Sequence, residues 1–370
     1  MWQPISFIAE ISQNIPSLPN VDILKVFGTI IFLIVCFFAT QMYLKIFSQS
    51  PKTFFDGRKT KKKLDIIIPA VDLQLAIKNT KHLLKCENVK RIIIVNPEKE
   101  GTSGKYLFVK DGKNGRAEAI NMAIDRIESK HVLIIDEDHY ITEDSIDKAL
   151  KLLEEYDIVK LTLLPNPDKM PKDLFRKTVM VERLFIEKDV IPKAVYPHYG
   201  GTGFFKTEVL KDLKFDNSFL TEDIDLTVRA YKKGYTIVSV PDVFAYEEYP
   251  SFKGWLVQRR RWAYGWFQVF RKHIKDLKHR KVRGILYSQL FTFIPLLIVP
   301  SLSFGNLLPP LVSAILSLYC IFPILLVGLK YGKHPIIALS FLVYYFVLMF
   351  YSSITSFVPL KKYVITPKGG

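Results

Sequence analysis

A short apolar segment that runs directly into three acidic residues limits the fold of this chain more than any other feature. Residues 132–135 are Val-Leu-Ile-Ile, and residues 136–138 are Asp-Glu-Asp. Such a run is typical of a strand buried on both faces, as in the sheets of α/β proteins. Ligands of these sheets bind beyond the carboxyl ends of the strands. Hard divalent ions prefer carboxylate oxygens, so we expect Asp138, helped by Asp136, to hold Mg²⁺ or Mn²⁺, although a solvated acidic turn would show the same residues.

Further apolar segments alternate with helical patterns through the middle of the chain. The predicted strands cover residues 64–69, 91–95, 106–109, 132–135, 158–163 and 235–240. Strands that alternate with helices in this way predict an α/β fold with a mainly parallel sheet flanked by helices. A dinucleotide site would need G-x-G-x-x-G after the first strand, and the sequence has neither this motif nor a P-loop there. The glycine-rich residues 199–205 are expected to form a loop, and Thr221 is expected to cap a helix.

Four long uncharged runs lie outside this region, at about residues 26–43, 285–304, 308–329 and 335–358. Each could cross a hydrocarbon layer of roughly 30 Å as a helix. We therefore expect an integral membrane protein with one N-terminal and about three C-terminal spans. Lysines and an arginine follow the first run, which predicts an outside N-terminus and a cytosolic catalytic domain. The basic C-terminal tail fits this topology less well, and a re-entrant last segment would remove the conflict.

These patterns divide the chain into four parts. We expect an N-terminal segment with a span over 1–50, a cytosolic domain over 51–250, interfacial helices over 251–284 and a transmembrane region over 285–370. The net charge of +16 would suit nucleic acid, but basic residues between 271 and 283 directly precede a predicted span. Such clusters attract anionic lipid headgroups, so we expect a membrane surface and no nucleic acid as the partner.

Several short motifs occur in a fixed order between the predicted spans. They are Lys113 to Asn121, Asp136 with Asp138, Gly201 to Lys206, Thr221-Glu222-Asp223, and Gln258 with Arg261 and Trp262. Together they resemble the membrane-bound family 2 glycosyltransferases of GT-A fold, the branch that contains ceramide glucosyltransferase, cellulose synthase and hyaluronan synthase. The resemblance covers about residues 60–270.

The resemblance implies roles for residues around the transferred sugar. Asp223, with its neighbour Glu222, is the candidate base for an acceptor hydroxyl. Arg261 would pair with the diphosphate, Trp262 would stack near the acceptor or sugar, and Gln258 would hydrogen-bond. We expect the neighbouring Arg259 and Arg260 to contact lipid headgroups instead.

The remaining substrate-binding candidates come from the other motifs. Lys113 and Asn121 belong to the segment before the D-x-D strand, and Gly201 and Gly203 to the acceptor-side loop. Family members usually carry a uracil-reading aspartate after the second strand, where this chain has Asn96. Asp72, after the first strand, is the candidate to substitute for a missing Y-N-E motif. A UDP-sugar remains the favoured donor.

The resulting expectation is an inverting, metal-dependent transfer of a hexose from a nucleotide-diphospho sugar to a lipid acceptor at the cytosolic membrane face. A processive polysaccharide synthase is the first alternative, because Q-x-x-R-W also occurs in those enzymes. The second is a non-catalytic membrane protein that binds sugar nucleotides.

Overall fold

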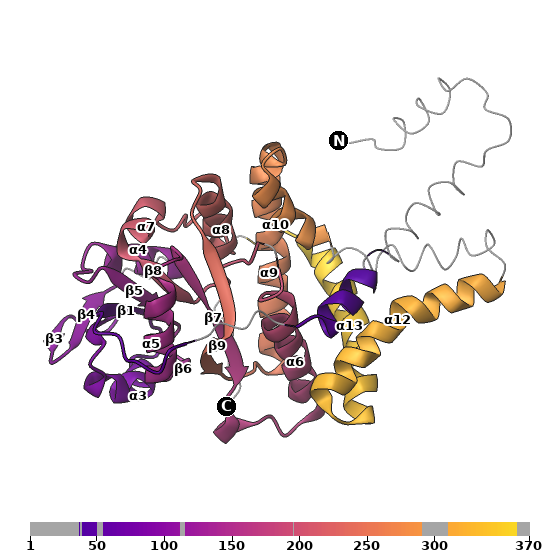
Figure 1. Cartoon of the computed structure of the whole chain (residues 1–370), viewed down its shortest axis with the longest axis horizontal. Helices are drawn as coiled ribbons and strands as arrows, with labels where there is room; N and C mark the ends of the chain where they lie inside the picture. Colours follow the sequence, from indigo (N-terminus) through magenta and orange to yellow (C-terminus); the bar gives the residue numbers. More distant parts are fainter. Residues whose placement is uncertain are drawn as a thin grey trace.

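The computed structural model describes residues 37, 39–49, 55–111, 115–194, 196–290 and 310–360. Within these residues the strands form one nine-stranded sheet in the order β3-β4-β2-β1-β5-β8-β7-β9-β6 (Figure 1). The strands run over β1 Leu64–Pro69, β2 Val89–Asn96, β3 Gly101–Ser103, β4 Tyr106–Lys110, β5 His131–Ile134, β6 Tyr140–Ile141, β7 Ile158–Pro165, β8 Gly203–Lys206 and β9 Ile237–Glu247.

The sheet is mixed, whereas the sequence predicted a mainly parallel one. Strands β4, β2, β1 and β5 are parallel neighbours, and so are β7 and β9. Strand β8 enters between β5 and β7 and is antiparallel to both. A Cβ atom on Gly203 would lie 2.5 Å from the carbonyl oxygen of Val159, so only glycine permits this close pairing. The sequence motif that predicted a loop therefore supplies part of the sheet.

Helices cover both faces of the sheet. One buried core joins β-strand residues such as Ile66 and Ile68 to α3 (Leu73–Thr80) and α5 (Glu143–Leu152). The other joins Ile67 and Ile93 to α4, α7 and α8. The bounds of these three helices are Arg116–Ile124, Thr207–Leu213 and Glu222–Lys232. Alternate residues of β1 thus pack against opposite helix layers, which is the burial expected for a central strand.

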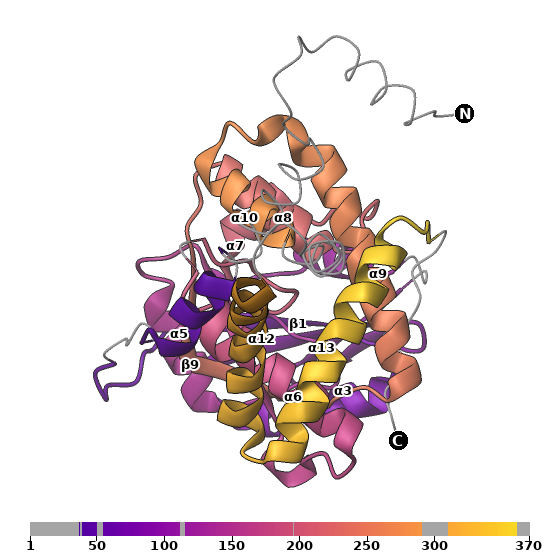
Figure 2. The same ribbon diagram turned by 90° about the vertical axis from the view of Figure 1, so that its right-hand side faces the viewer.

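A further group of helices packs beside the sheet, as Figures 1 and 2 show. It comprises α6 (Leu174–Phe185), α9 (Phe252–His273), α10 (Arg280–Leu290), α12 (Pro310–Gly332) and α13 (Pro335–Ser356). A third core that includes Val181, Trp255, Val327 and Phe341 joins α6, α9, α12 and α13. Short one-turn elements complete the chain at η1 Lys81–Lys85, η2 Pro167–Lys169, η3 Ile186–Val190 and η4 Ile274–Asp276.

A buried carboxylate fastens the C-terminal helices to this layer. Asp189 of η3 accepts hydrogen bonds from Lys193 at 2.6 Å, from Lys330 at 2.8 Å and from the Tyr331 hydroxyl at 2.6 Å. Lys330 also donates to the carbonyl oxygen of Ile46, in the helical residues 39–47, at 3.1 Å. One side chain therefore connects η3, α12 and the N-terminal helix.

The predicted membrane spans are only partly covered by the described residues. Most of 26–43 and of 285–304 lies outside them, and the part of 285–304 that is described begins inside α10, whose Ile285 and Leu286 are buried in the domain core. Among the described helices, α13 alone is long and apolar enough to cross a membrane, and α12 contributes a shorter apolar stretch, Ile321–Gly332. Length and composition of this kind also occur in core helices of other proteins.

Candidate active site

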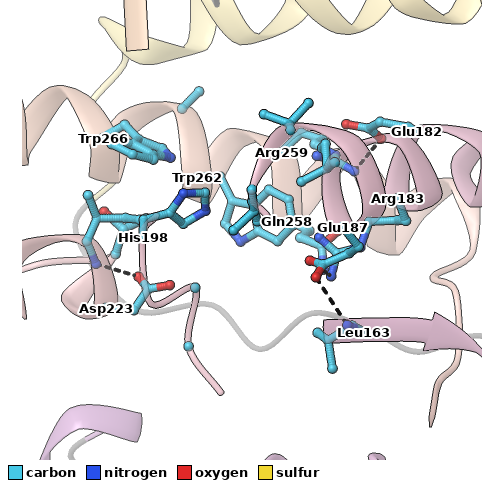
Figure 3. A pocket seen from close by; sticks show the side chains of 18 of the residues that line it. Leu163, Glu182, Arg183, Glu187, His198, Asp223, Gln258, Arg259, Trp262 and Trp266 are labelled. Carbon is cyan, nitrogen blue, oxygen red and sulfur yellow. Dashed lines mark hydrogen bonds and ion pairs between the residues drawn. The ribbon is translucent and has the colours of Figure 1, made fainter. Parts of the chain in front are cut away.

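A cavity of about 1000 Å³ lies where the carboxyl end of β5, the start of α8 and the middle of α9 meet. Eight residues predicted to take part in catalysis, metal binding or substrate binding line it, namely Asp136, Asp138, Gly201, Glu222, Asp223, Gln258, Arg261 and Trp262. They come from four separate segments of the chain. The fold therefore brings most of the predicted site residues into one cavity, and Figure 3 labels Asp223, Gln258 and Trp262 among them.

Arg116 connects the segments at the acidic end of this cavity. It lies at the first position of α4, and its guanidinium group donates to Asp136 at 2.9 Å, to Glu222 at 2.9 Å and to the carbonyl oxygen of Gly201 at 2.6 Å. Hydrogen bonds of an arginine to carboxylates are among the strongest in proteins because both partners are charged. One side chain thus fixes the acids after β5, the glycine-rich segment and the start of α8 relative to one another.

Asp223 stands next to this network, in the first turn of α8. A Cβ atom on Gly201 would lie 3.5 Å from its Oδ2 atom, so the carboxylate faces backbone across a narrow gap. Burial, followed by repulsion from Glu222, raises the pKa of Asp223 to about 6, against the opposing effect of Arg116 and Arg261. A carboxyl group of this pKa is largely ionised at neutral pH and close to the value that suits a general base.

A glycine of α9 lets α8 come close enough to share the cavity. A Cβ atom on Gly265 would lie 2.7 to 2.9 Å from three atoms of Thr221, at the N-terminal end of α8. Thr221 occupies the predicted cap position, but its hydroxyl does not cap the helix; it is buried against α9 and has no hydrogen-bond partner among the described residues. The contact thereby brings Glu222 and Asp223 to the helix that carries Gln258, Arg261 and Trp262.

Asp136, Asp138 and His139 offer ligand atoms that lie within 4.8 Å of one another. Two of these groups are carboxylates, and Asp138 is only 7% exposed, which suits a hard divalent cation that must neutralise buried charge. The backbone N–H of Asp136 donates to Nδ1 of His139 at 3.3 Å, so this ring nitrogen already has a partner, and Nε2 lies 4.0 Å from Oδ1 of Asp138. The donor set fits a divalent ion, with the two carboxylates as the natural ligands.

Arg259 corrects one expectation from the sequence. It does not face lipid headgroups: it is 5% exposed, and its guanidinium group donates to Glu182 of α6 at 2.6 Å. The same guanidinium group lies over the ring of Trp262, 4.5 Å from its centroid. Arg259 and Arg261 both line the cavity, and its contact with α6 takes Arg259 into the protein.

The lining also includes apolar side chains of α6, η3 and α13, here called the apolar arm, beside the charged Glu182, Arg183 and Glu187 of α6 and η3. The arm is lined by Val179, Phe185, Ile186, Val190, Phe341, Tyr345 and Leu348. The wall of this part comes partly from α13, about 200 residues later in the chain than Asp136 and Asp138. A single cavity thus joins a charged end to an apolar one.

Two predicted ligands lie elsewhere because their side chains shape turns. Asp72 caps α3 by accepting from the N–H of Leu75 at 2.9 Å. The amide oxygen of Asn96 accepts from Glu98 and Lys99 at 2.9 and 2.8 Å, in the turn after β2. Both side chains already have local hydrogen bonds and lie outside the lining of the cavity.

Two further predicted residues, Asn121 and Gly203, are also absent from the lining. The amide of Asn121 exchanges two hydrogen bonds with the backbone of Phe215, at 2.8 and 2.9 Å, and so ties α4 to the segment after α7. Gly203 serves the sheet pairing described above. Lys113 lies outside the described residues.

Arg116 and His198 line the cavity but were not predicted as site residues. Arg116 belongs to the same motif as Lys113, which resembles a K-x-x-A-x-N segment of the family 2 glycosyltransferases. Arg116 lies three residues before Ala119 and five before Asn121, so it fits this spacing with arginine in place of lysine. An alignment of the motif that starts at Arg116 would have identified this residue as a site residue. His198 belongs to no motif, and nothing in its neighbourhood in the sequence indicates a role.

Comparisons with known proteins agree with this geometry. The sequence model of glycosyl transferase family group 2 matches residues 131–360, which are 230 of the 370 residues. The probable glycosyltransferase YdaM of Bacillus subtilis (strain 168) is 32% identical over 96 residues, which are 25% of this chain and 23% of that protein. Glucomannan 4-beta-mannosyltransferase 1 of Cyamopsis tetragonoloba is 35% identical over 80 residues, 21% of this chain and 15% of that protein. The alignments thus span less than a quarter of either relative.

One solved structure covers nearly the whole chain. The mannosyltransferase PcManGT from Pyrobaculum calidifontis, in complex with GDP-Man and Mn²⁺, superposes with a TM-score of 0.59 over 90% of this chain and 98% of that one. The two sequences are 16% identical, so the likeness concerns the fold, which is of the GT-A type.

Proposed function

Because the chain belongs to glycosyl transferase family group 2 and is a glycosyltransferase, we propose that it moves a hexose from a nucleotide-diphospho sugar to a lipid acceptor at the cytosolic face of a membrane. One observation carries the proposal. The cavity that holds Asp138 and Asp223 continues without a break into an arm lined by apolar residues of α6 and α13. A polar donor and a lipid chain can therefore occupy the same cavity from its two ends.

The reaction is an inverting displacement. The oxygen of the acceptor hydroxyl attacks the anomeric carbon of the sugar, and the bond from that carbon to the diphosphate oxygen breaks. The electron pair leaves with the nucleotide diphosphate, and the carboxylate of Asp223 takes the hydroxyl proton. Its pKa of about 6 leaves it ionised before the reaction at neutral pH, and Glu222 next to it contributes to that value.

Asp138 and Asp136 would hold the divalent ion, Mg²⁺ or Mn²⁺, whose charge stabilises the leaving diphosphate. The related fold of PcManGT contains Mn²⁺, which supports this choice. Arg261 would pair with the diphosphate oxygens that remain. Trp262 would stack on the sugar or acceptor, and Gln258 would hydrogen-bond to it.

A continuous apolar stripe on α13 supports the membrane part of the proposal. Seven of its side chains are between 49% and 64% exposed and recur every three or four residues: Ile336, Leu339, Val343, Val347, Phe350, Ile354 and, just after the helix, Phe357. Exposed apolar patches of this extent mark contacts with a membrane or another protein. A bilayer on this side would give the apolar arm direct access to lipid chains, with the N-terminus outside and the sheet domain in the cytosol.

The experiment that tests the proposal is a donor panel on the full-length protein in detergent with mixed lipids. It measures nucleotide diphosphate release from UDP-sugars and from GDP-mannose, with and without Mn²⁺, and identifies products by mass spectrometry. GDP-mannose is included beside the favoured UDP-sugars because two of the compared proteins are mannosyltransferases. We expect metal-dependent release coupled to a singly glycosylated lipid. A ladder of long, lipid-free glycan would contradict the lipid acceptor and favour a polysaccharide synthase.

A further inference from the structure

His198 lines the cavity, with Lys160 and Gly200 close to its ring, and we call this part of the cavity the middle section. It lies in the segment between η3 and β8, and Figure 3 shows its ring pointing into the same space as Trp262 and Trp266. The ring packs edge-on against Trp266, with 6.2 Å between the centroids. In the part of the chain that the structure describes, neither ring nitrogen of His198 has a hydrogen-bond partner. Its hydrogen-bonding capacity therefore faces the cavity.

Two consecutive glycines lie beside this imidazole and beside Asp223. A Cβ atom on Gly200 would lie 3.8 Å from Nε2 of His198, and one on Gly201 would lie 3.5 Å from Oδ2 of Asp223. Both glycines have positive φ angles, 71° and 86°, that side chains rarely allow. The imidazole thus lies beside Gly200, where the Cε atom of Lys160 is also close at 3.3 Å, and the Asp223 carboxylate lies beside Gly201.

The walls of this middle section carry charges that are balanced in pairs. Lys160 lies 2.5 Å from Glu187, and Arg183 makes two hydrogen bonds of 2.8 and 3.2 Å to Glu247. Arg259 and Glu182 form the third pair described above. Burial, with repulsion from Lys160, lowers the pKa of His198 to about 4, so the ring is uncharged at neutral pH. The section presents many hydrogen-bonding groups but no surplus charge.

The other cations of the lining act elsewhere. Arg261 lowers the pKa of Asp223 and so belongs to the acidic end. Lys45 donates to the carbonyl oxygen of Lys193, and Arg280 is exposed. A phosphate brought into the middle section would lose its water without gaining a cation, and an uncompensated buried charge is strongly unfavourable. Hydroxyl groups, by contrast, can donate to carboxylates and accept from guanidinium groups or an imidazole.

We propose that this middle section is the acceptor-headgroup subsite, that His198 hydrogen-bonds the headgroup beside the reacting hydroxyl, and that the headgroup carries hydroxyl groups and no phosphate. The inference rests on the proposed transfer to a lipid and adds the chemical class of the acceptor. In this assignment His198 binds the acceptor, and the residues at the acidic end bind the donor.

The test compares acceptors of matched chain length with the full-length protein. Uncharged hydroxyl lipids (ceramide, diacylglycerol and a monohexosyl diacylglycerol) are set against phosphatidic acid and a polyprenyl phosphate, with products read by mass spectrometry. We expect at least one uncharged lipid to exceed both phosphate lipids by about tenfold or more in kcat/KM, the scale of one lost charge-assisted contact. Preference for a phosphate lipid, or donor hydrolysis without transfer to either class, would overturn the inference. Absence of both donor binding and hydrolysis would instead overturn the proposed function.

Variants of His198 separate its role from a structural one. His198→Ala should raise the KM for the acceptor about tenfold while donor KM and metal-dependent donor hydrolysis stay unchanged, and His198→Asn should restore part of the loss. His198→Arg should move selectivity toward phosphate lipids, because it adds a cation to a neutral section. The matched control is His131→Ala, at the opposite end of β5 and outside the cavity. Wild-type acceptor KM in His198→Ala, or unchanged selectivity in a folded His198→Arg, would refute the assignment.

Discussion

The two ends of the cavity are held together by different forces. At the acidic end, Arg116 joins three separate segments through hydrogen bonds of 2.6 to 2.9 Å. In the apolar arm, side chains of α6 and α13 such as Val179 and Leu348 are held by packing. Hydrogen-bond geometry tolerates little displacement, whereas an apolar surface accepts any chain that fits its volume. The acidic end is therefore suited to chemistry and the arm to choosing the acceptor.

If this contrast is right, the largest losses should follow changes to the carboxylates. Asp138→Asn and Asp223→Asn should each lower kcat about 1000-fold, within the range known for loss of a metal ligand or general base. Asp223→Asn should spare donor binding, and Asp138→Asn should weaken it in a metal-dependent way. Donor titration with and without Mn²⁺, beside nucleotide release, distinguishes the two.

Asp168→Asn is the control for both variants, because Asp168 is exposed in η2 and outside the cavity. If Asp138→Asn and Asp223→Asn kept the activity of Asp168→Asn, the roles proposed for the two carboxylates would be wrong.

Arg116→Gln should have the next largest effect, a loss of about 100-fold in kcat/KM, on the scale of removing a preorganised donor. Its three hydrogen bonds would be lost or weakened together, and the acids around it would repel one another. Since Arg116 lowers the pKa of Asp223, the acid limb of the pH profile should also move to higher pH. Arg126→Gln, at an exposed position just after α4, is the control. An equal loss in this variant would mean that the three hydrogen bonds of Arg116 are unimportant for activity.

The effect of pH on kcat/KM should be smaller than the effects of these substitutions, but it tests the role of Asp223 directly. Asp223 must be ionised to accept a proton, and its raised pKa of about 6 means that this form is lost as the pH falls through 6. Below that value kcat/KM should decline about tenfold per pH unit, and above it the profile should level off. Rate measurements from pH 4.5 to 8 at saturating metal test this, and a flat profile down to pH 5 would exclude Asp223 as the base.

The smallest effect should come from a substitution in the apolar arm of the cavity. Leu348→Trp narrows the cavity and should raise the KM for a long-chain acceptor about fivefold, or roughly 1 kcal/mol, the lower range for overpacking. Donor hydrolysis should not change, because the acids are untouched. Leu339→Trp lies on the same helix but is 58% exposed, and it should have wild-type kinetics. Equal effects of the two variants would mean that the arm does not bind the acceptor chain.

Much of the fold follows directly from the sequence. Apolar runs such as 64–69 and 132–135 predict buried strands, and the structure confirms both, because a strand covered on two faces needs side chains of this kind throughout. The family match confirms the glycosyltransferase prediction. Strand β8 could not be predicted in this way, since its glycine is required by the neighbouring backbone of β7 and not by any local pattern.

The site was predictable only where a motif carried it. Asp138 and Asp223 belong to motifs, and the cavity includes both. Arg259 belongs to a run of arginines beside an apolar region, and only the position of Glu182 on another helix decides that it is buried. His198 depends on tertiary contacts with Trp266 and on a glycine pair, which no linear pattern reveals.

The three hydrogen bonds to Asp189 have a consequence for a protein at a membrane. Two of them, from Lys330 and Tyr331, secure the C-terminal end of α12 to η3, which lines the cavity, and Lys330 also ties in the N-terminal helix. With α13 resting in lipid, the carboxylates would stand at a constant height above the bilayer surface. If the acceptor is the proposed lipid, the distance by which its headgroup reaches out of the bilayer would determine which of its hydroxyl groups arrives at Asp223.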